Sequence, residues 1–210
     1  MLMKFYLPTF ILLLIFNCSC EQLLCSRASL KSSEPTLKTD SIVSFLESQY
    51  TAVGYRFNGS PEGVWYLYDG NQIKGTVEYN RGLLHGTQTL YYQYPSQLAQ
   101  VTNWYNNQKH GFEKVFFKNG RLYKDRVYSN GLLSGTVRWY TPNGILFYQS
   151  EYENGKKNGS TVDFSPYSGD TIKMFDYERG NLLEKKVLRE DLDTVNLMFY
   201  IKRLVKTGNL

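Results

Sequence analysis

The chain has 210 residues, a net charge of +5 and an aromatic content of 16%. Its basic residues are spread singly or in pairs, so the sequence lacks the stripe of Lys and Arg that would neutralise the phosphates of a nucleic acid. We therefore expect no nucleic-acid partner, and no motif indicates a cofactor. The many Tyr and Phe residues favour strands, because flat side chains pack well on a pleated surface.

The first 19 residues are predicted to be a signal peptide. Lys4 precedes an apolar run from Leu7 to Phe16, which is about half the ~20 residues that a membrane-spanning helix needs. The next residues, Asn17-Cys18-Ser19-Cys20, resemble a bacterial lipoprotein signal, in which a Cys after small residues is acylated and becomes the first mature residue. The resemblance implies lipidation of Cys20, with Cys18 as the alternative, and a lipid anchor in a bacterial membrane, on the periplasmic or outer face.

Residues 20–39 are polar and rich in Ser and Lys, and we expect them to form a flexible tether. A short helix is predicted over residues 40–53, with Asp40 as its N-cap and Gly54 at its end. Its apolar residues fall at near-helical spacing: Ile42, Phe45, Leu46 and Tyr50. A helix of about three turns is not stable alone, so it must dock on another element.

A five-residue pattern, G-x-x-x-G, recurs between residues 59 and 159. Its closing glycines, at positions 63, 86, 111, 135 and 159, are 23 to 25 residues apart, and the third copy has Asn107 in place of its first Gly. An aromatic residue follows each closing Gly at the fifth position: Tyr68, Tyr91, Phe116, Tyr140 and Phe164. A fixed period in the twenties indicates stacked units, each too small to bury its own apolar face.

Each unit is predicted to be a β-hairpin with a return loop, because Asn-Gly and Asp-Gly favour tight hairpin turns and Gly accepts a positive φ. We expect residues 54–186 to form an elongated, single-layer antiparallel meander of about five hairpins, so the fold is mainly β. Strand alternation places Trp65 and Leu67 on one face and Tyr66 and Tyr68 on the other. Residues 187–210 are predicted to form a C-terminal capping helix, with a final hairpin as the alternative.

The repeats resemble those of the MORN-repeat proteins, and most of all the bacterial YwqK-type variant that is associated with toxin–antitoxin antitoxins. Two segments carry the resemblance most clearly: Tyr128-Ser129-Asn130-Gly131-Leu132-Leu133-Ser134-Gly135 and Tyr152-Glu153-Asn154-Gly155-Lys156-Lys157-Asn158-Gly159. It covers roughly residues 55–185 and implies a hairpin scaffold. A repeat type defines a scaffold and not its ligand.

Few residues point to chemistry. His85 and His110 both precede a closing Gly and are interpreted as exposed loop residues, because a metal site would need a third ligand. Glu78, Glu151 and Asp176 recur at one repeat position and are interpreted as decoration of an exposed strand face, with a glycosidase pair as the alternative. We therefore expect no enzymatic activity, no metal and no cofactor.

Aromatic residues dominate binding hot spots, so the candidate binding surface consists of large rings on the strands. Its members are Trp65, Trp104, Trp139, Tyr68, Tyr91 and Tyr140. A core role is the competing interpretation for the three Trp residues. The leading hypothesis is a non-enzymatic, envelope-anchored scaffold that binds an unidentified envelope protein. The alternatives are an antitoxin, implied by the family resemblance, and a surface that stacks Tyr and Trp rings on glycans.

Overall fold

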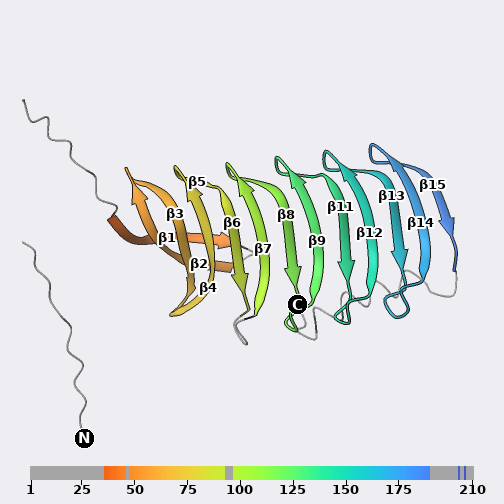
Figure 1. The fold of residues 1–210 in the computed structure, drawn as a ribbon, viewed down its shortest axis with the longest axis horizontal. Helices are drawn as coiled ribbons and strands as arrows, with labels where there is room; N and C mark the ends of the chain where they lie inside the picture. Colours follow the sequence, from red (N-terminus) through yellow and green to blue (C-terminus); the bar gives the residue numbers. More distant parts are fainter. Residues whose placement is uncertain (1–35, 46–47, 93–96, 190–202, 204–205, 207–210) are drawn as a thin grey trace, which may run out of the picture. The chain divides into compact units, whose positions relative to one another are not determined.

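The computed structural model describes residues 36–45, 48–92, 97–189, 203 and 206. The described residues up to 187 form one open antiparallel sheet, in which strands follow one another in chain order from β1 to β15 (Figure 1). Two short strands lie off this path, β5 pairing with β4 and β10 with β9. The strands are β1 Thr36–Phe45, β2 Ser48–Phe57, β3 Ser60–Asp69, β4 Gln72–Asn80, β5 Leu83–Leu84, β6 Gly86–Tyr91, β7 Leu98–Tyr105, β8 Gln108–Phe116, β9 Leu122–Ser129, β10 Leu132–Leu133, β11 Gly135–Tyr140, β12 Leu146–Glu153, β13 Lys156–Phe164, β14 Thr171–Glu178 and β15 Asn181–Val187.

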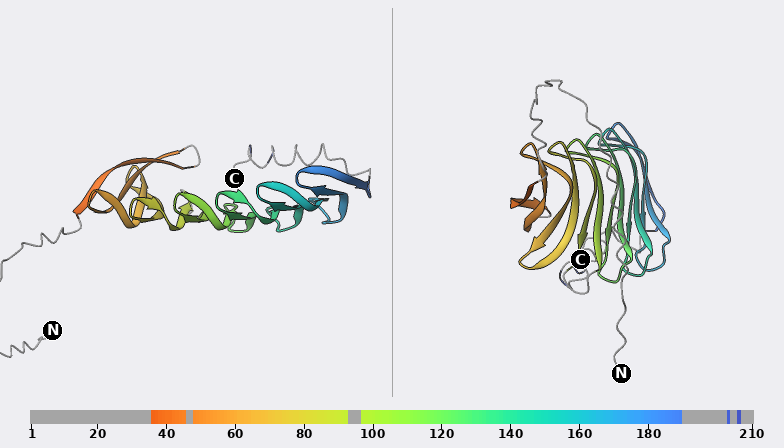
Figure 2. Two further views of the ribbon diagram at one scale, coloured as in Figure 1. Left: turned by 90° about the horizontal axis from the view of Figure 1, so that it is seen from above. Right: turned by 60° about the vertical axis from the view of Figure 1, so that its left-hand side comes forward.

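The predicted mainly β fold, an open antiparallel hairpin meander, is confirmed. Figure 2 shows the strands from β3 onward as a single curved layer. The described sheet has more strands than the sequence suggested, because β1 and β2 extend it at one edge. In addition, β5 and β10 are two-residue strands that end just before a closing glycine.

The predicted helix over residues 40–53 is wrong, because residues 40–45 lie in strand β1 and residues 48–53 lie in strand β2. An isolated three-turn helix has little to stabilise it, whereas β2 bonds along the edge of β3 and so satisfies its backbone groups in a ladder. The last four residues of the predicted tether, 36–39, also belong to β1. The signal peptide over residues 1–19 and the rest of the tether lie outside the described residues.

The C-terminal helix predicted over residues 187–210 falls almost entirely outside the described residues. Within that range, Val187 is the last residue of β15, and Arg203 and Lys206 are helical.

Six two-residue turns connect the strands at one end of the sheet, and both residues of each turn have a positive φ. They are Asn58-Gly59, Arg81-Gly82, Asn106-Asn107, Asn130-Gly131, Asn154-Gly155 and Arg179-Gly180. Positive φ at both positions is the signature of a type I′ turn, whose twist matches that of the flanking strands. The first Gly of each G-x-x-x-G pattern is thus the second residue of a hairpin turn, and Asn107 takes this conformation with a φ of 65°.

Each of these turns after the first is hydrogen-bonded to the preceding repeat. The backbone N–H of the second turn residue donates to a carbonyl in the preceding loop at 2.8–2.9 Å: Gly82 to Pro61, Asn107 to Leu84, Gly131 to Lys109, Gly155 to Leu133 and Gly180 to Lys157. Consecutive repeats are therefore joined at their turns as well as along their strands.

Bulges recur at one repeat position, next to the aromatic residue five places after each closing glycine. The register shifts at Leu67/Tyr68, Leu90/Tyr91, Val115/Phe116, Trp139/Tyr140 and Asp163/Phe164. A bulge adds one residue on the partner strand and redirects its side chain. The added residue opposite Trp139/Tyr140 is Phe147, which is completely buried and packs near Trp139 and Tyr148.

The two faces of the sheet differ in burial. We define the core face by a cross-strand row that runs Ala52, Leu67, Gly75, Leu90, Gln100, Val115, Lys124, Trp139, Tyr148, Asp163, Lys173 and Val187. The exposed face is defined by the adjacent row Val53, Tyr66, Thr76, Thr89, Val101, Lys114, Asp125, Arg138, Gln149, Val162, Met174 and Lys186. The predicted alternation of Trp65 and Leu67 against Tyr66 and Tyr68 agrees with this register.

Two apolar clusters form the core. The first consists of Ala52, Trp65, Leu67, Val77 and Leu90, and the second consists of Phe117, Tyr123 and Phe147. Gly54 belongs to the first cluster, because a Cβ there would overlap the ring of Trp65. The strands between the clusters bury polar side chains instead, and these form part of the candidate site.

Replacing Gly159 by Ala should destabilise the sheet more than replacing Gly63 by Ala. Both glycines have a positive φ, 95° and 68°, but a Cβ on Gly159 would overlap the Glu151 carboxylate, whereas a Cβ on Gly63 meets nothing within 4 Å. Moving Glu151 would cost its hydrogen bond from the Ser160 N–H, 3.1 Å long, which is worth about 1 kcal/mol. Urea unfolding of both variants measures the difference, and equal losses of stability would contradict this account.

Candidate functional site

The six aromatic residues of the predicted binding surface divide between the two faces. Trp65, Trp104 and Trp139 lie on the core face, and Tyr68, Tyr91 and Tyr140 alternate onto the exposed face. Trp65 is 1% exposed and belongs to the apolar core, and its indole N–H donates to the Tyr55 carbonyl. The other five rings are half-buried.

Another set of aromatic residues, which shares Trp104 with the predicted binding surface, forms a row on the core face. Each closing glycine lies directly opposite one of them: Gly63 and Tyr79, Gly86 and Trp104, Gly111 and Tyr128, Gly135 and Tyr152, Gly159 and Tyr177. We call these five rings the aromatic row. A glycine leaves room beside it, and a ring on the neighbouring strand covers the exposed backbone. All five rings are half-buried, so each keeps an accessible part.

Cationic side chains lie over these and neighbouring rings. The Lys109 ammonium is 5.9 Å from the centre of the Trp104 ring and 5.2 Å from that of Tyr128. The Lys157 ammonium is 4.7 Å from the centre of the Tyr177 ring. Such cation–π contacts hold the lysine stems against the sheet and leave positive charge beside the aromatic surface.

A buried carboxylate, Glu113, lies between the two apolar clusters and is only 1% exposed. Lys109 pairs with it at 2.5 Å, and Arg126 forms a second ion pair. The Tyr128 hydroxyl donates to it at 3.3 Å, and the Gln100 amide donates at 3.4 Å. Four donors compensate the charge, so this cluster both replaces an apolar core and ties strands β7, β8 and β9 together.

Several buried donors around this cluster lack a hydrogen-bond partner within the described part of the chain. They are the Gln88 amide nitrogen, Nε of Arg126 and the indole N–H of Trp139. Gln88 itself is 2% exposed and accepts a hydrogen bond from the Trp104 indole at 2.9 Å. Buried polar groups are normally paired, so these three donors are exceptions among the described residues.

One acidic and one basic side chain on the core face, Asp163 and Lys124, have shifted pKa values. Burial raises the pKa of Asp163 above its usual 3.8, and the charges of Lys157 and Lys173 offset part of that rise. Asp163 stands at a repeat position that holds Leu67, Leu90, Val115 and Trp139 in the other copies. Burial and the nearby Arg126 lower the pKa of Lys124, which stacks between the rings of Tyr123 and Trp139 at 4.6 Å from each centre.

The histidines and loop polar residues have a structural role at the turns. The side chain just before a closing glycine accepts the backbone N–H of a residue in the next turn: Glu62 from Arg81 at 2.6 Å, His110 from Asn130 at 3.3 Å, and Asn158 from Arg179 at 3.0 Å. His85 instead contacts the Asn106 side chain at 3.3 Å. In these three copies, the side chain before the closing glycine therefore serves as a hydrogen-bond acceptor for the next turn.

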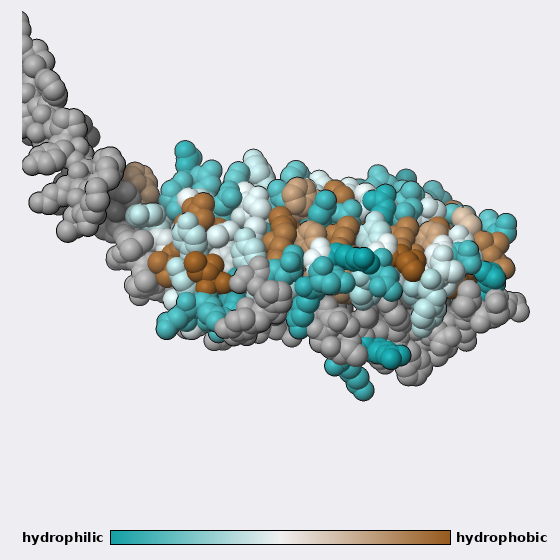
Figure 3. Space-filling model, turned by 60° about the horizontal axis from the view of Figure 1, so that its bottom comes forward, coloured by the Kyte–Doolittle hydropathy of each residue, from teal (hydrophilic) through white to brown (hydrophobic). Residues whose placement is uncertain are grey.

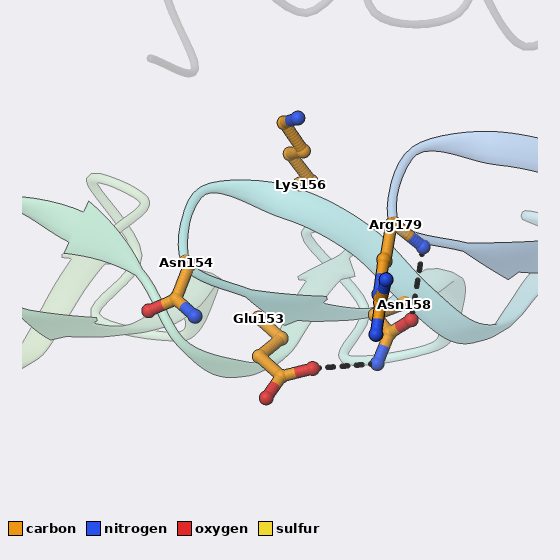
Figure 4. A pocket seen from close by; sticks show the side chains of 5 residues that line it. All are labelled: Glu153, Asn154, Lys156, Asn158 and Arg179. Carbon is orange, nitrogen blue, oxygen red and sulfur yellow. Dashed lines mark hydrogen bonds between the residues drawn. The ribbon is translucent and has the colours of Figure 1, made fainter.

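A surface cavity of about 370 Å³ lies between two of these turns (Figure 4). It is lined by Glu153, Asn154, Lys156, Asn158 and Arg179. The Asn158 amide donates a hydrogen bond to the Glu153 carboxylate at 2.7 Å. Its lining groups are mostly exposed and already hydrogen-bonded to one another, so we assign no ligand to it.

Apolar side chains also emerge on the exposed face. Val64, Tyr66, Phe112, Val127 and Met174 are between 37% and 46% exposed. Phe112 and Val127 are direct cross-strand neighbours on β8 and β9. In the view of Figure 3, apolar residues form separate groups between polar ones.

The predicted lipidation site, Cys20, and its alternative, Cys18, lie outside the described residues. Among the residues that the structure does describe, no cluster of His, Cys, Asp and Glu suits a metal ion. No helix within the same ranges is long and apolar enough to cross a membrane.

Comparisons with known proteins add little. No family model matches the chain, and no curated protein matches it. Among solved structures, the chain is similar to one described as "Crystal structure of GtfA/B complex bound to UDP and GlcNAc", with a TM-score of 0.28 and 10% sequence identity. The match covers 70% of this chain and 26% of that chain, and at this TM-score it carries no inference about fold or function.

Replacing Glu113 by Ala should destabilise the protein by about 3 kcal/mol, because removing one member of a buried ion cluster leaves its partners uncompensated. The matched control is Glu178→Ala on the exposed end of β14, which should change stability by less than about 0.5 kcal/mol. Urea unfolding of both variants tests this. A loss at Glu113 no larger than that of the control would mean that the cluster contributes nothing to the fold.

Proposed function

We propose that this chain is a non-enzymatic scaffold of the cell envelope that binds another protein through the exposed face of its sheet. The observation that carries the proposal is the cross-strand pair Phe112 and Val127, which are 43% and 39% exposed in the middle of the sheet. Apolar side chains of this size on an open surface are typical of binding sites.

The layout of the sheet supports a binding role. A single layer leaves one face open, and the bulges and stacked turns hold that face in a defined shape. The exposed apolar residues are interleaved with Lys114, Asp125 and Arg138 on the same face. A partner would therefore meet apolar anchors surrounded by charges, which is the usual composition of a transient protein interface.

The partner can be tested with a photo-crosslinking amino acid at position 112 in intact cells. We expect a crosslink to a second protein, and we expect Val127→Asp to abolish it, because a charge on the neighbouring strand would oppose apolar contact. The control is the same amino acid at Phe57, which is 52% exposed beside the first turn. The proposal is wrong if position 112 captures no protein, or if Val127→Asp leaves the crosslink unchanged.

The envelope location rests on the lipoprotein-type signal of residues 1–20. Diacyl or triacyl chains on Cys20 would add roughly 0.8 kcal/mol per buried methylene, which is enough for stable anchoring.

Labelled palmitate should therefore be incorporated by the wild type and by Cys18→Ala, but not by Cys20→Ala, and only Cys20→Ala should leave the membrane fraction. Label that persists in Cys20→Ala would exclude this residue as the anchor. An unlabelled, soluble wild type would remove the envelope assignment altogether and would favour the antitoxin hypothesis.

A glycan-binding surface is the second candidate function, and the aromatic row favours it. Its rings stand two strands apart, which is about 9–10 Å at the usual strand spacing. An extended glycan presents sugar faces at a regular interval, against which such rings could stack. The family resemblance to MORN-type repeats is compatible with either function.

A further inference from the structure

The last strand of the sheet, β15, has unusual exposure. Every residue from Asn181 to Val187 is exposed. Four large apolar residues lie here: Leu182 is 52% exposed, Leu183 65%, Val187 39% and Leu188 45%. Figure 3 shows a group of apolar residues at the right-hand end of the sheet, where Figure 1 places β15. Long apolar edge strands readily pair with another chain.

The backbone of β15 is arranged to accept such a strand. The Leu188 N–H donates to the Ile172 carbonyl at 2.8 Å, so Leu188 faces β14. In an antiparallel ladder, alternate residues bond to one neighbour, and the residues between them face the other side. The N–H and C=O groups of Lys185 and Val187 therefore point to the outer edge of β15, along which no strand of the described residues lies.

We propose that the outer edge of β15 pairs antiparallel with β15 of a second copy of this chain, about a two-fold axis at Lys185. This register places Glu184 opposite Lys186 of the second copy, and Lys186 opposite its Glu184. Leu183 faces Val187 of the second copy in the same way. The two copies together would form one continuous sheet, with isologous contacts as expected for a closed dimer.

Charge selects this register over its neighbours. An axis at Glu184 would set the two Glu184 side chains opposite each other, and an axis at Lys186 would do the same for Lys186. Like charges directly opposite each other on paired strands are destabilising, and opposite charges are stabilising. With the axis at Lys185, the two Lys185 residues also lie opposite each other, as a hydrogen-bonded pair whose Cα atoms are about 5.5 Å apart. Two Glu–Lys pairs flank this like-charge pair and offset it, whereas neither neighbouring axis forms a Glu–Lys pair.

Pairing at β15 involves the sheet edge, whereas the proposed partner binds the exposed face, so loss of one contact would leave the other intact. The alternative for β15 is that Lys185 and Lys186 only protect the edge from pairing, a common use of edge lysines. That alternative predicts that the wild type and the charge variants of β15 are all monomers.

Sedimentation of the full chain in detergent distinguishes the two. We expect a dimer, a shift toward monomer in Lys186→Glu, and recovery of the dimer in the charge-swapped variant Glu184→Lys/Lys186→Glu. Lys156→Glu, an exposed change on β13, is the matched control and should leave the dimer intact. A monomeric wild type, or a charge swap that does not recover the dimer, would overturn the proposal, provided that circular dichroism shows each variant folded.

Disulfide trapping tests the register directly, in a full chain whose three native cysteines are replaced by Ser. Lys185→Cys should crosslink to itself, because disulfides need Cα separations of roughly 4.4–6.8 Å and the axis brings residue 185 to about 5.5 Å from its copy. Lys186→Cys on the same exposed strand should crosslink much more slowly. Equal or faster crosslinking at position 186 would exclude an axis at Lys185.

Discussion

The structure depends on the bonds that join each hairpin turn to the repeat before it. A one-layer sheet buries little of each strand, so a single hairpin of this sequence cannot stabilise itself. Two hydrogen bonds join a turn to the repeat before it. The backbone N–H of Gly131 donates to the Lys109 carbonyl, and the backbone N–H of Asn130 donates to the His110 side chain. Both bonds require a positive φ at the turn, which brings the N–H groups into line with the preceding loop. The G-x-x-x-G pattern is therefore a stacking device, and its glycines serve the contact between repeats.

Having one face to bury determines where function can lie. The core face alternates between apolar clusters around Trp65 and Phe147 and the polar cluster around Glu113. A continuous apolar stripe would be more stable but would tolerate sliding of one strand past another, whereas the bonds of Glu113 are satisfied in one register only. Because these side chains occupy most of the core face, that face leaves only the accessible parts of the aromatic row for a ligand, and a protein partner is expected on the exposed face or at the sheet edge. Phe112 and Val127 lie on the first of these surfaces, and Leu183 and Val187 lie on the second.

The sequence predicted some elements better than others, for reasons that differ from element to element. Strand alternation around Trp65 and Trp139 follows from a period of two residues, so it could be read without a structure. The helix predicted over residues 40–53 failed because its apolar spacing fits a short helix and a strand about equally well, and only the open edge of β3 decides between them. The candidate site could be predicted only in part. Tyr128 and Tyr152 were recognised as the first residues of two repeat segments, but their pairing with Gly111 and Gly135 was not predicted.

By itself, the sequence determined the repeat length, the hairpin turns and the mainly β class, because these depend on local φ preferences and on the spacing of glycines and rings. Only the tertiary structure decided which side chains became core and which became surface. The bulge beside Trp139 turns Phe147 into the core, and Glu113 is buried because Gln100, Lys109 and Arg126 come from three different strands to meet it. Such placements depend on the register between paired strands, and no local pattern specifies that register.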